Sequence, residues 1–248
     1  MLVTGFPAGA FAANCYLVAP APGEECVIID PGQDAERGIE ELLGRYRLKP
    51  IAVLLTHGHI DHMWSVAPVC GAKGVPAYIH PDDRELLANP GKGLDLLLGQ
   101  QLFGGMTFSE PDDVKELSDG EKVTLGGVDF AIGHTPGHTP GSVTFRSGAD
   151  DLDDKPASFW PDAEGSISQA RQKEAGLLFT GDLLFAGSIG RTDLPGGDHA
   201  TILKSLARTL TLPDETIVLP GHGPQTTIGV ERRGNPFLTG LQPAQKGL

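Results

Sequence analysis

A cluster of metal-ligand residues directly follows an apolar run that is typical of a β-strand. Residues 51–56 read Ile-Ala-Val-Leu-Leu-Thr, and the next six read His-Gly-His-Ile-Asp-His. In an extended segment, side chains two positions apart point the same way, so His57 and His59 can face one ion. The chain then turns and brings Asp61 and His62 to the same place. Imidazole and carboxylate groups suit Zn²⁺ and other first-row divalent ions, so this segment predicts a metal site at a strand end.

Three further segments repeat the order of strand, turn and potential ligand. His138 lies in the Gly/Pro-rich loop Thr-Pro-Gly-His-Thr-Pro-Gly-Ser, Asp182 follows Leu-Leu-Phe-Thr-Gly, and His222 follows Ile-Val-Leu-Pro-Gly. A lone histidine in a loop is more often a turn or surface residue than a ligand. Seven such residues, all at strand ends, favour a metal centre over packing or surface roles.

The distribution of apolar residues predicts an α/β fold with sheets covered by helices. Helical periodicity appears over residues 34–47, with Asp34 as a possible cap, and over residues 198–210. Strand–helix units mixed with hairpin-type strands favour a layered domain. The short β-type runs cover residues 15–18, 26–29, 51–55, 77–79, 128–132, 142–145, 177–180 and 217–219.

The length of 248 residues fits one domain, which we expect to cover residues 1–248. A polar, turn-rich stretch at about 147–176 carries seven acidic residues and predicts a surface insertion between two core strands. Its Phe-Trp-Pro triplet at 159–161 leaves open the alternative of a lid over a cleft. A short C-terminal tail is expected from about residue 229.

Charge and cysteine content restrict the partners and the compartment. The formal net charge is −13 and no dense basic run is present, so we expect no nucleic-acid partner. Cys15, Cys26 and Cys70 lie in apolar surroundings without regular spacing, which predicts buried free thiols. We find no signal peptide and no apolar run of the ~20 residues that a membrane span needs. The expected location is the cytoplasm, without membrane association.

The remaining histidines and two aromatic residues have simpler interpretations. We expect His80 in a strand-to-helix turn, His134 beside the metal ligands or packed in its loop, and His199 solvated at a helix start. Tyr16 and Trp64 are expected to be core residues.

Four motifs occur in an order that resembles the metallo-β-lactamase superfamily: HxHxDH, TPGHTPGS, TGDLLF and PGHG. The resemblance runs from about residue 1 to residue 240. It implies a four-layer αββα sandwich with a dinuclear metal site along one edge. Two divalent ions are implied, with zinc expected and iron or manganese also compatible. By motif, the first ion would be held by His57, His59 and His138, the second by Asp61, His62 and His222, and both would be bridged by Asp182.

Within that superfamily, residues 181–197 and 223–237 are similar to single-domain bacterial hydroxyacylglutathione hydrolases, also called glyoxalase II. This resemblance implies hydrolysis of a small-molecule S-2-hydroxyacyl thioester by a metal-bridged hydroxide, and Asp61 is our candidate to orient that nucleophile. The sequence departs from this family in two places. Met63-Trp64-Ser65 replaces a small, Gly-rich turn, and the helical C-terminal domain of eukaryotic members is missing.

Arg191 lies nine residues after Asp182, where that family commonly carries a basic substrate contact. Its guanidinium could pair with a substrate carboxylate. The alternative is a surface arginine that pairs with Asp193. The sequence does not separate these two roles.

Several other functions compete with thioester hydrolysis. A mononuclear iron persulfide dioxygenase would use only His57, His138 and Asp182 as ligands. A phosphodiesterase or RNA-processing nuclease on the same fold is disfavoured by the negative charge, and a full ligand set argues against a binding module whose metal only holds its loops. Hydrolysis of β-lactams or lactones ranks lower. We expect a monomer or a small homo-oligomer.

Overall fold

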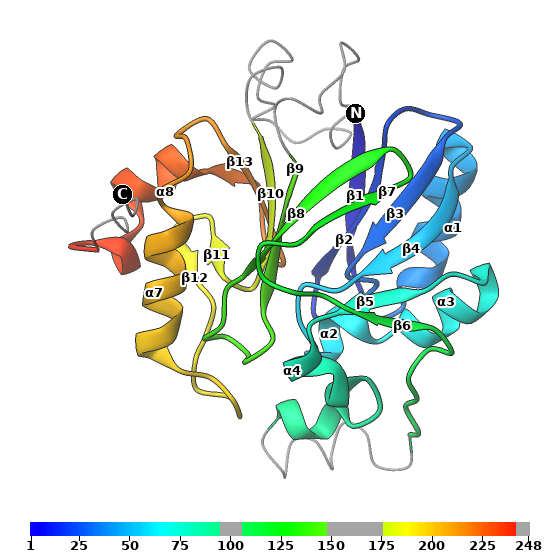
Figure 1. Ribbon diagram of the computed structural model, residues 1–248, viewed down its shortest axis with the longest axis horizontal. Coiled ribbons are helices and arrows are strands. Elements are labelled where there is room, and N and C mark those ends of the chain that lie inside the picture. The colour runs from blue at the N-terminus through cyan, green and yellow to red at the C-terminus, as the bar shows by residue number, and fades with distance from the viewer. Residues whose placement is uncertain (95–105, 148–175, 242–248) are drawn as a thin grey trace.

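The computed structural model describes residues 1–94, 106–147 and 176–241. Its core is formed by two six-stranded mixed sheets that face each other, with helices on the outer side of each (Figure 1). The insertion expected at 147–176 falls almost entirely outside the described residues, so its interpretation as a surface loop or lid remains a prediction. The expected C-terminal tail begins inside helix α8 (Ile228–Gly234).

The first sheet combines two hairpin strands with a parallel half. Strands β1, β2 and β3 pair antiparallel, whereas β3, β4, β5 and β6 run parallel. The strands β1 to β6 lie in sequence order across the sheet and span Leu2–Ala8, Ala13–Ala19, Glu25–Ile29, Lys49–Leu54, Ala77–Ile79 and Val114–Glu116. Their connections contain α1 (Ala35–Tyr46), α2 (Ile60–Met63), α3 (Val66–Lys73), α4 (Pro81–Arg84) and the 3-10 helices η1 (Glu85–Leu87) and η2 (Pro90–Gly93).

The second sheet is mostly antiparallel and has the order β14-β13-β10-β9-β8-β7. Its one parallel pair joins β10 to β13, and helix α7 (His199–Thr209) connects these two strands. Its strands β7, β8, β9, β10, β13 and β14 span Lys122–Leu125, Val128–His134, Val143–Ser147, Leu177–Gly181, Ile217–Pro220 and Thr226–Thr227. The remaining elements are the small hairpin β11 (Leu184–Phe185) and β12 (Ser188–Ile189) and the 3-10 helix η4 (Pro236–Leu238).

The alternation of side chains along the strands creates three apolar layers. In β3, Val27 and Ile29 point between the two sheets, while Ile28 packs against α1 and α3 on the outer face. In β10, Phe179 lies between the sheets and Leu178 packs on the side of α7. Every strand of this kind buries both faces, which requires a helical layer outside each sheet. The predicted αββα sandwich is therefore confirmed.

Some local predictions differ from the structure. Asp34 precedes α1, but its side chain forms no capping hydrogen bond and its backbone has a positive φ of 55°. Asp34 therefore stands at the expected N-cap position but does not cap the helix through its side chain. The first strand, Leu2–Ala8, was not among the predicted strands because Gly5, Pro7 and Gly9 obscure its alternation. By contrast, Asp198 does cap α7, where its carboxylate accepts a hydrogen bond from the Thr201 amide at 2.6 Å.

All three cysteines are free and buried, as predicted. Burial raises the pKa of the Cys26 and Cys70 thiols to about 12, so neither is ionised at neutral pH. None of the helices in the described part of the chain has the length and apolarity that a bilayer crossing requires.

Candidate metal centre

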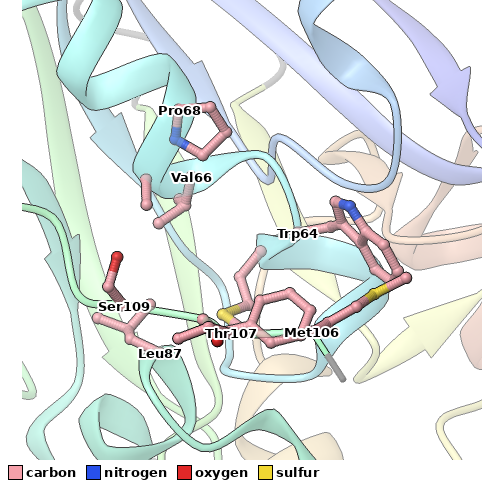
Figure 2. A pocket seen from close by; sticks show the side chains of 10 residues that line it. Trp64, Val66, Pro68, Leu87, Met106, Thr107 and Ser109 are labelled. Carbon is pink, nitrogen blue, oxygen red and sulfur yellow. The ribbon is translucent and has the colours of Figure 1, made fainter. Parts of the chain in front are cut away.

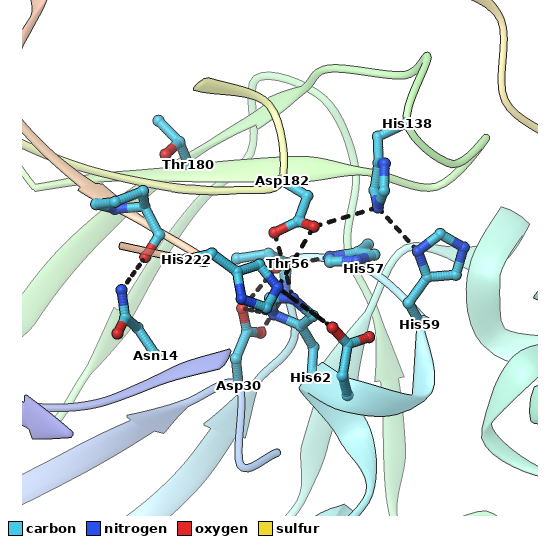
Figure 3. A network of polar contacts seen from close by, with 12 residues as sticks. Asn14, Asp30, Thr56, His57, His59, His62, His138, Thr180, Asp182 and His222 are labelled. Atoms are coloured by element: carbon cyan, nitrogen blue, oxygen red, sulfur yellow. Dashed lines mark hydrogen bonds and ion pairs between the residues drawn. The ribbon is translucent and has the colours of Figure 1, made fainter. Parts of the chain in front are cut away.

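The seven predicted ligands meet at one edge of the two sheets, where strands from both halves end (Figure 3). His57 and His59 follow β4, and Asp61 and His62 lie on the single turn of α2. The second sheet contributes the other three residues. His138 lies between β8 and β9, Asp182 follows β10 and His222 follows β13. All seven residues that the sequence singled out as ligands are thus brought together.

The short helix α2 explains how four potential ligands fit within six residues. His59 is extended, with φ −69° and ψ 144°, and stands at the N-cap position of α2. The chain changes from strand to helix at this residue. His57 and His59 therefore project from extended backbone, and Asp61 and His62 follow from the helical turn. Gly32 packs against this turn so closely that a Cβ there would lie 2.1 Å from the Asp61 carbonyl oxygen.

The first group of ligands consists of three buried imidazoles. The potential ligand atoms of His57, His59 and His138 all lie within 4.8 Å of one another. His59 Nδ1 and His138 Nε2 face each other at 2.8 Å. Two ring nitrogens at this distance are stable only with a proton or a cation between them.

The second group consists of Asp61, His62 and His222, whose ligand atoms also lie within 4.8 Å of one another. His222 Nε2 lies 3.2 Å from both His62 Nε2 and Asp61 Oδ2. The Asp182 carboxylate stands between the two groups. Its oxygens lie 3.3 Å from His62 Nε2, 3.5 Å from His138 Nε2 and 3.7 Å from His222 Nε2.

The chemistry of these donors fits two divalent ions. His57 Nε2 and Asp182 Oδ1 are buried atoms without a hydrogen-bond partner among the described residues. Leaving such polar atoms unpaired is costly unless a ligand satisfies them. Five imidazoles and two carboxylates converge on two adjacent points, and nitrogen and oxygen donors in this arrangement suit Zn²⁺, Fe²⁺ or Mn²⁺. The cluster is a metal-binding site of His and Asp residues.

The pKa values of the ligands are shifted in both directions. Burial acts to lower the pKa of His62 and His222, but the Asp61 and Asp182 carboxylates outweigh it and both pKa values are raised, so an ion bound there would displace a proton. Burial, together with the neighbouring imidazoles, lowers the pKa of His57, and burial with His138 lowers the pKa of His59 to about 3. Burial acts to raise the pKa of Asp61 and Asp182, but the nearby His62 outweighs it and both pKa values are lowered. Neutral imidazoles and ionised carboxylates are the forms that bind metals.

Asp30 is a further site residue that the sequence analysis did not identify. Its carboxylate accepts hydrogen bonds from the Thr56 amide at 2.8 Å and the Thr56 hydroxyl at 2.6 Å, and it lies 3.1 Å from His62 Nδ1. The Thr56 hydroxyl in turn lies 3.0 Å from His57 Nδ1. These contacts assign the protons to Nδ1 of both histidines and leave Nε2 free to bind metal. Asp30 directly follows a strand, which was the available signal.

Asp83 connects two of the ligand loops. It is fully buried, and its Oδ2 accepts hydrogen bonds from the Gly58 amide at 2.8 Å and the Thr139 hydroxyl at 2.6 Å. Its Oδ1 accepts a third hydrogen bond from the Gly141 amide at 2.8 Å. Gly58 separates His57 from His59, and Thr139 follows His138. Asp83 therefore holds the segment of His57 and His59 in place relative to the loop of His138. No sequence motif indicated this role.

The loop that carries His222 is fixed by β2. The Asn14 side chain donates to the Pro220 and Gly223 carbonyls at 3.0 and 2.9 Å. Tyr16, which was expected in the core, is buried there and its hydroxyl donates to the Pro220 carbonyl at 2.8 Å. The hydrogen bonds from one strand of the first sheet therefore position a ligand of the second sheet.

Arg191 contacts the centre through its backbone. Its carbonyl oxygen accepts a hydrogen bond from His138 Nδ1 at 2.8 Å. This contact places the proton on Nδ1, so His138 Nε2 can bind a metal ion. Its exposed guanidinium forms two hydrogen bonds with the Asp193 carboxylate, at 2.7 and 2.8 Å. The structure therefore contains the surface pair that the sequence offered as one of two alternatives, beside a site that a substrate would approach.

The other histidines lie outside the two ligand groups. His80 precedes α4, as expected, and its ring stacks on that of His134 with 4.1 Å between the ring centroids. His134 Nε2 lies 2.8 Å from the Pro140 carbonyl, so this residue packs in the loop of His138. His199 is exposed in the first turn of α7.

Comparison with known proteins agrees with this architecture. The model of the metallo-β-lactamase superfamily matches residues 8–152 and 168–222, and the chain belongs to this superfamily. With its His/Asp cluster, it is a metallo-hydrolase of that superfamily.

The chain is similar to proteins that are named for different activities. The chain is 35% identical to hydroxyacylglutathione hydrolase GloC of Haemophilus influenzae, over 94% of this chain and 95% of that protein. It is 38% identical to the BLEG-1 B3 metallo-β-lactamase, whose crystal structure matches 96% of this chain and 100% of that chain with a TM-score of 0.77. The chain is also 38% identical to TTHA1623, whose crystal structure in a di-iron-bound form matches 93% of this chain and 97% of that chain with a TM-score of 0.68.

Proposed function

We propose that this protein hydrolyses thioesters of the S-2-hydroxyacyl type, in the manner of glyoxalase II. The observation that carries the proposal is the assembly of two ligand groups around the shared Asp182 carboxylate. A persulfide dioxygenase would need His57, His138 and Asp182 alone, whereas here Asp61, His62 and His222 also converge. The similarity to hydroxyacylglutathione hydrolase GloC supports the choice of a thioester substrate.

The residues of the site can assist a reaction in which water replaces a thiol on an acyl carbon. Two divalent ions held here would polarise the acyl carbonyl and lower the pKa of a coordinated water towards about 7. Asp61 is partly exposed and ionised, so its carboxylate can accept a hydrogen bond from the attacking water and orient it. The carbon–oxygen bond forms first and gives a tetrahedral adduct, and the carbon–sulfur bond then breaks. The departing thiol has a pKa near ~8.5 and leaves as a thiolate without prior protonation.

We further propose that the two ions are zinc, with iron as the main alternative. Imidazole-rich sites with a few carboxylates accept both metals. The di-iron-bound form of TTHA1623 supports iron, and the neutral imidazoles of the first ligand group suit zinc. Elemental analysis of the purified protein distinguishes the two.

Hydrolysis of S-D-lactoylglutathione by metal-replete protein is the direct test, with free thiol release as the measurement. Turnover that chelation abolishes and added metal restores would support the proposal. Negligible turnover with two ions bound would contradict glutathione as the thiol carrier. Negligible turnover with a single bound iron would favour the persulfide dioxygenase.

A second candidate activity is hydrolysis of β-lactams, which the similarity to the BLEG-1 metallo-β-lactamase supports. The same ligand groups can serve an amide as well as a thioester. A chromogenic cephalosporin, assayed beside the thioester, separates the two. A kcat/KM for the cephalosporin above that for the thioester would reverse our order of preference.

The first prediction concerns Asp61. Replacement of Asp61 by Asn keeps a potential oxygen ligand but removes the charge that orients the attacking water. We expect kcat to fall about 100-fold while two ions remain bound. Thiol release and metal content, measured on the same preparation, check this. Wild-type turnover with full metal content would remove Asp61 from the reaction.

The second prediction concerns Arg191. If its guanidinium exchanges Asp193 for a substrate carboxylate, Arg191→Ala raises KM for an anionic glutathione thioester about tenfold and leaves KM for a neutral thioester unchanged. Steady-state kinetics with both substrates provide the measurement, and Asp193→Ala serves as the matched control. Equal effects of Arg191→Ala on the two substrates would assign the residue to the surface pair alone.

A further inference from the structure

A cavity of about 570 Å³ lies beside α2 (Figure 2). Its volume falls in the range of small-molecule binding sites, about 300–1,000 Å³. Its walls come from the end of α2, the start of α3, η1 and the segment that leads to β6. The residues around it are Met63, Trp64, Val66, Ala67, Pro68, Leu87, Met106, Thr107, Phe108 and Ser109.

The cavity is lined by the two residues that directly follow the last ligand of the HxHxDH motif. Met63 and Trp64 stand where the glyoxalase II pattern has a small, Gly-rich turn. Met63 is buried, but Trp64 is only partly buried, although we expected it in the core. A large indole at this position shapes the cavity wall.

Two walls of the cavity belong to elements that contact metal ligands. Trp64 follows Asp61 by three positions on helical backbone, and side chains three apart lie on neighbouring parts of a helix surface, about 5–6 Å between Cβ atoms. On the other wall, Leu87 belongs to η1, which η2 follows, and a Cβ on Gly93 of η2 would lie 2.9 Å from the His59 ring. The cavity therefore adjoins the helix that carries Asp61 and His62, and none of the residues around it is itself a ligand.

The lining has the character of a site for an aromatic ring. Trp64 and Phe108 form an edge-to-face pair with 5.6 Å between ring centroids and an angle of 85°. Met63 and Met106 add two thioethers, and sulfur atoms make favourable contacts with aromatic rings. A flat ring can extend such an edge-to-face arrangement, whereas a flexible alkyl chain gains no comparable geometry.

We propose that this cavity receives the acyl substituent of the substrate and selects aromatic 2-hydroxyacyl thioesters over small aliphatic ones. The inference rests on the proposed thioesterase function and specifies its substrate class. The reacting carbonyl lies at the metal centre, and the ring on the neighbouring carbon extends past Asp61 towards Trp64. Neither the thiol carrier nor the metal ligands contribute to this selection.

The test compares three glutathione thioesters, S-D-lactoyl, S-D-mandeloyl and S-(2-hydroxyhexanoyl), on metal-loaded protein. We expect the highest kcat/KM for the mandeloyl substrate. Ala67→Phe fills the cavity from α3 and should lower kcat/KM for the mandeloyl substrate about tenfold or more, with less than a twofold change for the lactoyl substrate. Ala72→Phe, on the same helix but exposed and outside the cavity, is the matched control. Equal losses for both substrates, or a higher kcat/KM for the hexanoyl substrate, would overturn the proposal.

A binding measurement separates this inference from the proposed function. In a Trp160→Phe background, Trp64 is the only tryptophan, and its fluorescence reports titration with D-mandelate or D-lactate. We expect mandelate to bind at least tenfold more tightly than lactate and Ala67→Phe to remove the difference. If no thioester is hydrolysed but this result holds, the aromatic cavity stands and the thioesterase assignment is wrong. If mandelate binds no more tightly than lactate, the cavity assignment is wrong even when both thioesters are hydrolysed. Met106→Ala, which widens the same cavity, should weaken mandelate binding without altering the fold.

Discussion

Asp182→Ala is expected to lower kcat for thioester hydrolysis about 1,000-fold or more. The carboxylate is the one ligand whose oxygens approach imidazoles of both groups, at 3.3 to 3.7 Å. If Asp182 bridges two ions as proposed, removing it takes a donor from each of them. Losing a single preorganised group in an active site commonly costs 10² to 10³ in rate, and here two ions lose a ligand.

Elemental analysis and steady-state kinetics of the Asp182→Ala protein check this expectation. We expect fewer than two ions per chain. Asp129→Ala serves as a control because that carboxylate lies on β8 and pairs with Lys122 rather than with the ligands. Two retained ions with activity within tenfold of wild type would show that Asp182 does not bridge the groups.

Asp83→Ala is expected to lower the free energy of unfolding by about 3 to 5 kcal/mol. The fully buried carboxylate accepts hydrogen bonds from the Gly58 amide, the Gly141 amide and the Thr139 hydroxyl. Alanine leaves these three donors without a partner, and each buried unpaired donor costs about 1–3 kcal/mol. Because Gly58 lies between His57 and His59, the loss also loosens the first ligand group.

Urea unfolding of the metal-free protein measures this effect without a contribution from bound ions. Asp82→Ala is the matched control, since its exposed carboxylate sits next in the chain, and it should change stability by less than about 0.5 kcal/mol. Asp83→Asn should fall between the two, because the amide retains one acceptor oxygen. A loss below about 1 kcal/mol for Asp83→Ala would show that water or a neighbouring group replaces the carboxylate.

The metal ligands were predictable because their signal is local. Four of the seven residues occur together in one motif after a strand, and the other three follow a strand or lie in a Gly/Pro-rich loop, so residue type and position in the chain were sufficient to identify them. Asp83 was not predictable in the same way, since its partners Gly58 and Thr139 lie 25 and 56 positions away in the sequence. The cavity beside Trp64 depends on packing between four separate elements, which no periodicity reveals.

The fold was predicted at the level of layers but not of every edge. Strand–helix units mixed with hairpin-type strands indicated sheets covered by helices, and the order of the four motifs implied the αββα sandwich. The strand at residues 2–8 and the short β6 were missed because glycine, proline or charged residues interrupt their alternation. For Arg191, the sequence indicated a role for the side chain but not for the backbone. The hydrogen bond between its carbonyl oxygen and His138 depends on the fold and has no signal in the residue type.

The distribution of the clustered His and Asp residues over the two sheets would make each bound ion a cross-link between the halves of the molecule. In the first group, His57 and His59 follow a strand of the first sheet and His138 lies between strands of the second. In the second group, Asp61 and His62 belong to the first half of the molecule and His222 to the second. Binding free energy is therefore also free energy that holds the sandwich closed. An ion at 100 times its dissociation constant adds about 2.7 kcal/mol to the folded state. Scarcity of metal would thus act on this protein twice, by removing its chemistry and by lowering the amount of chain that stays folded.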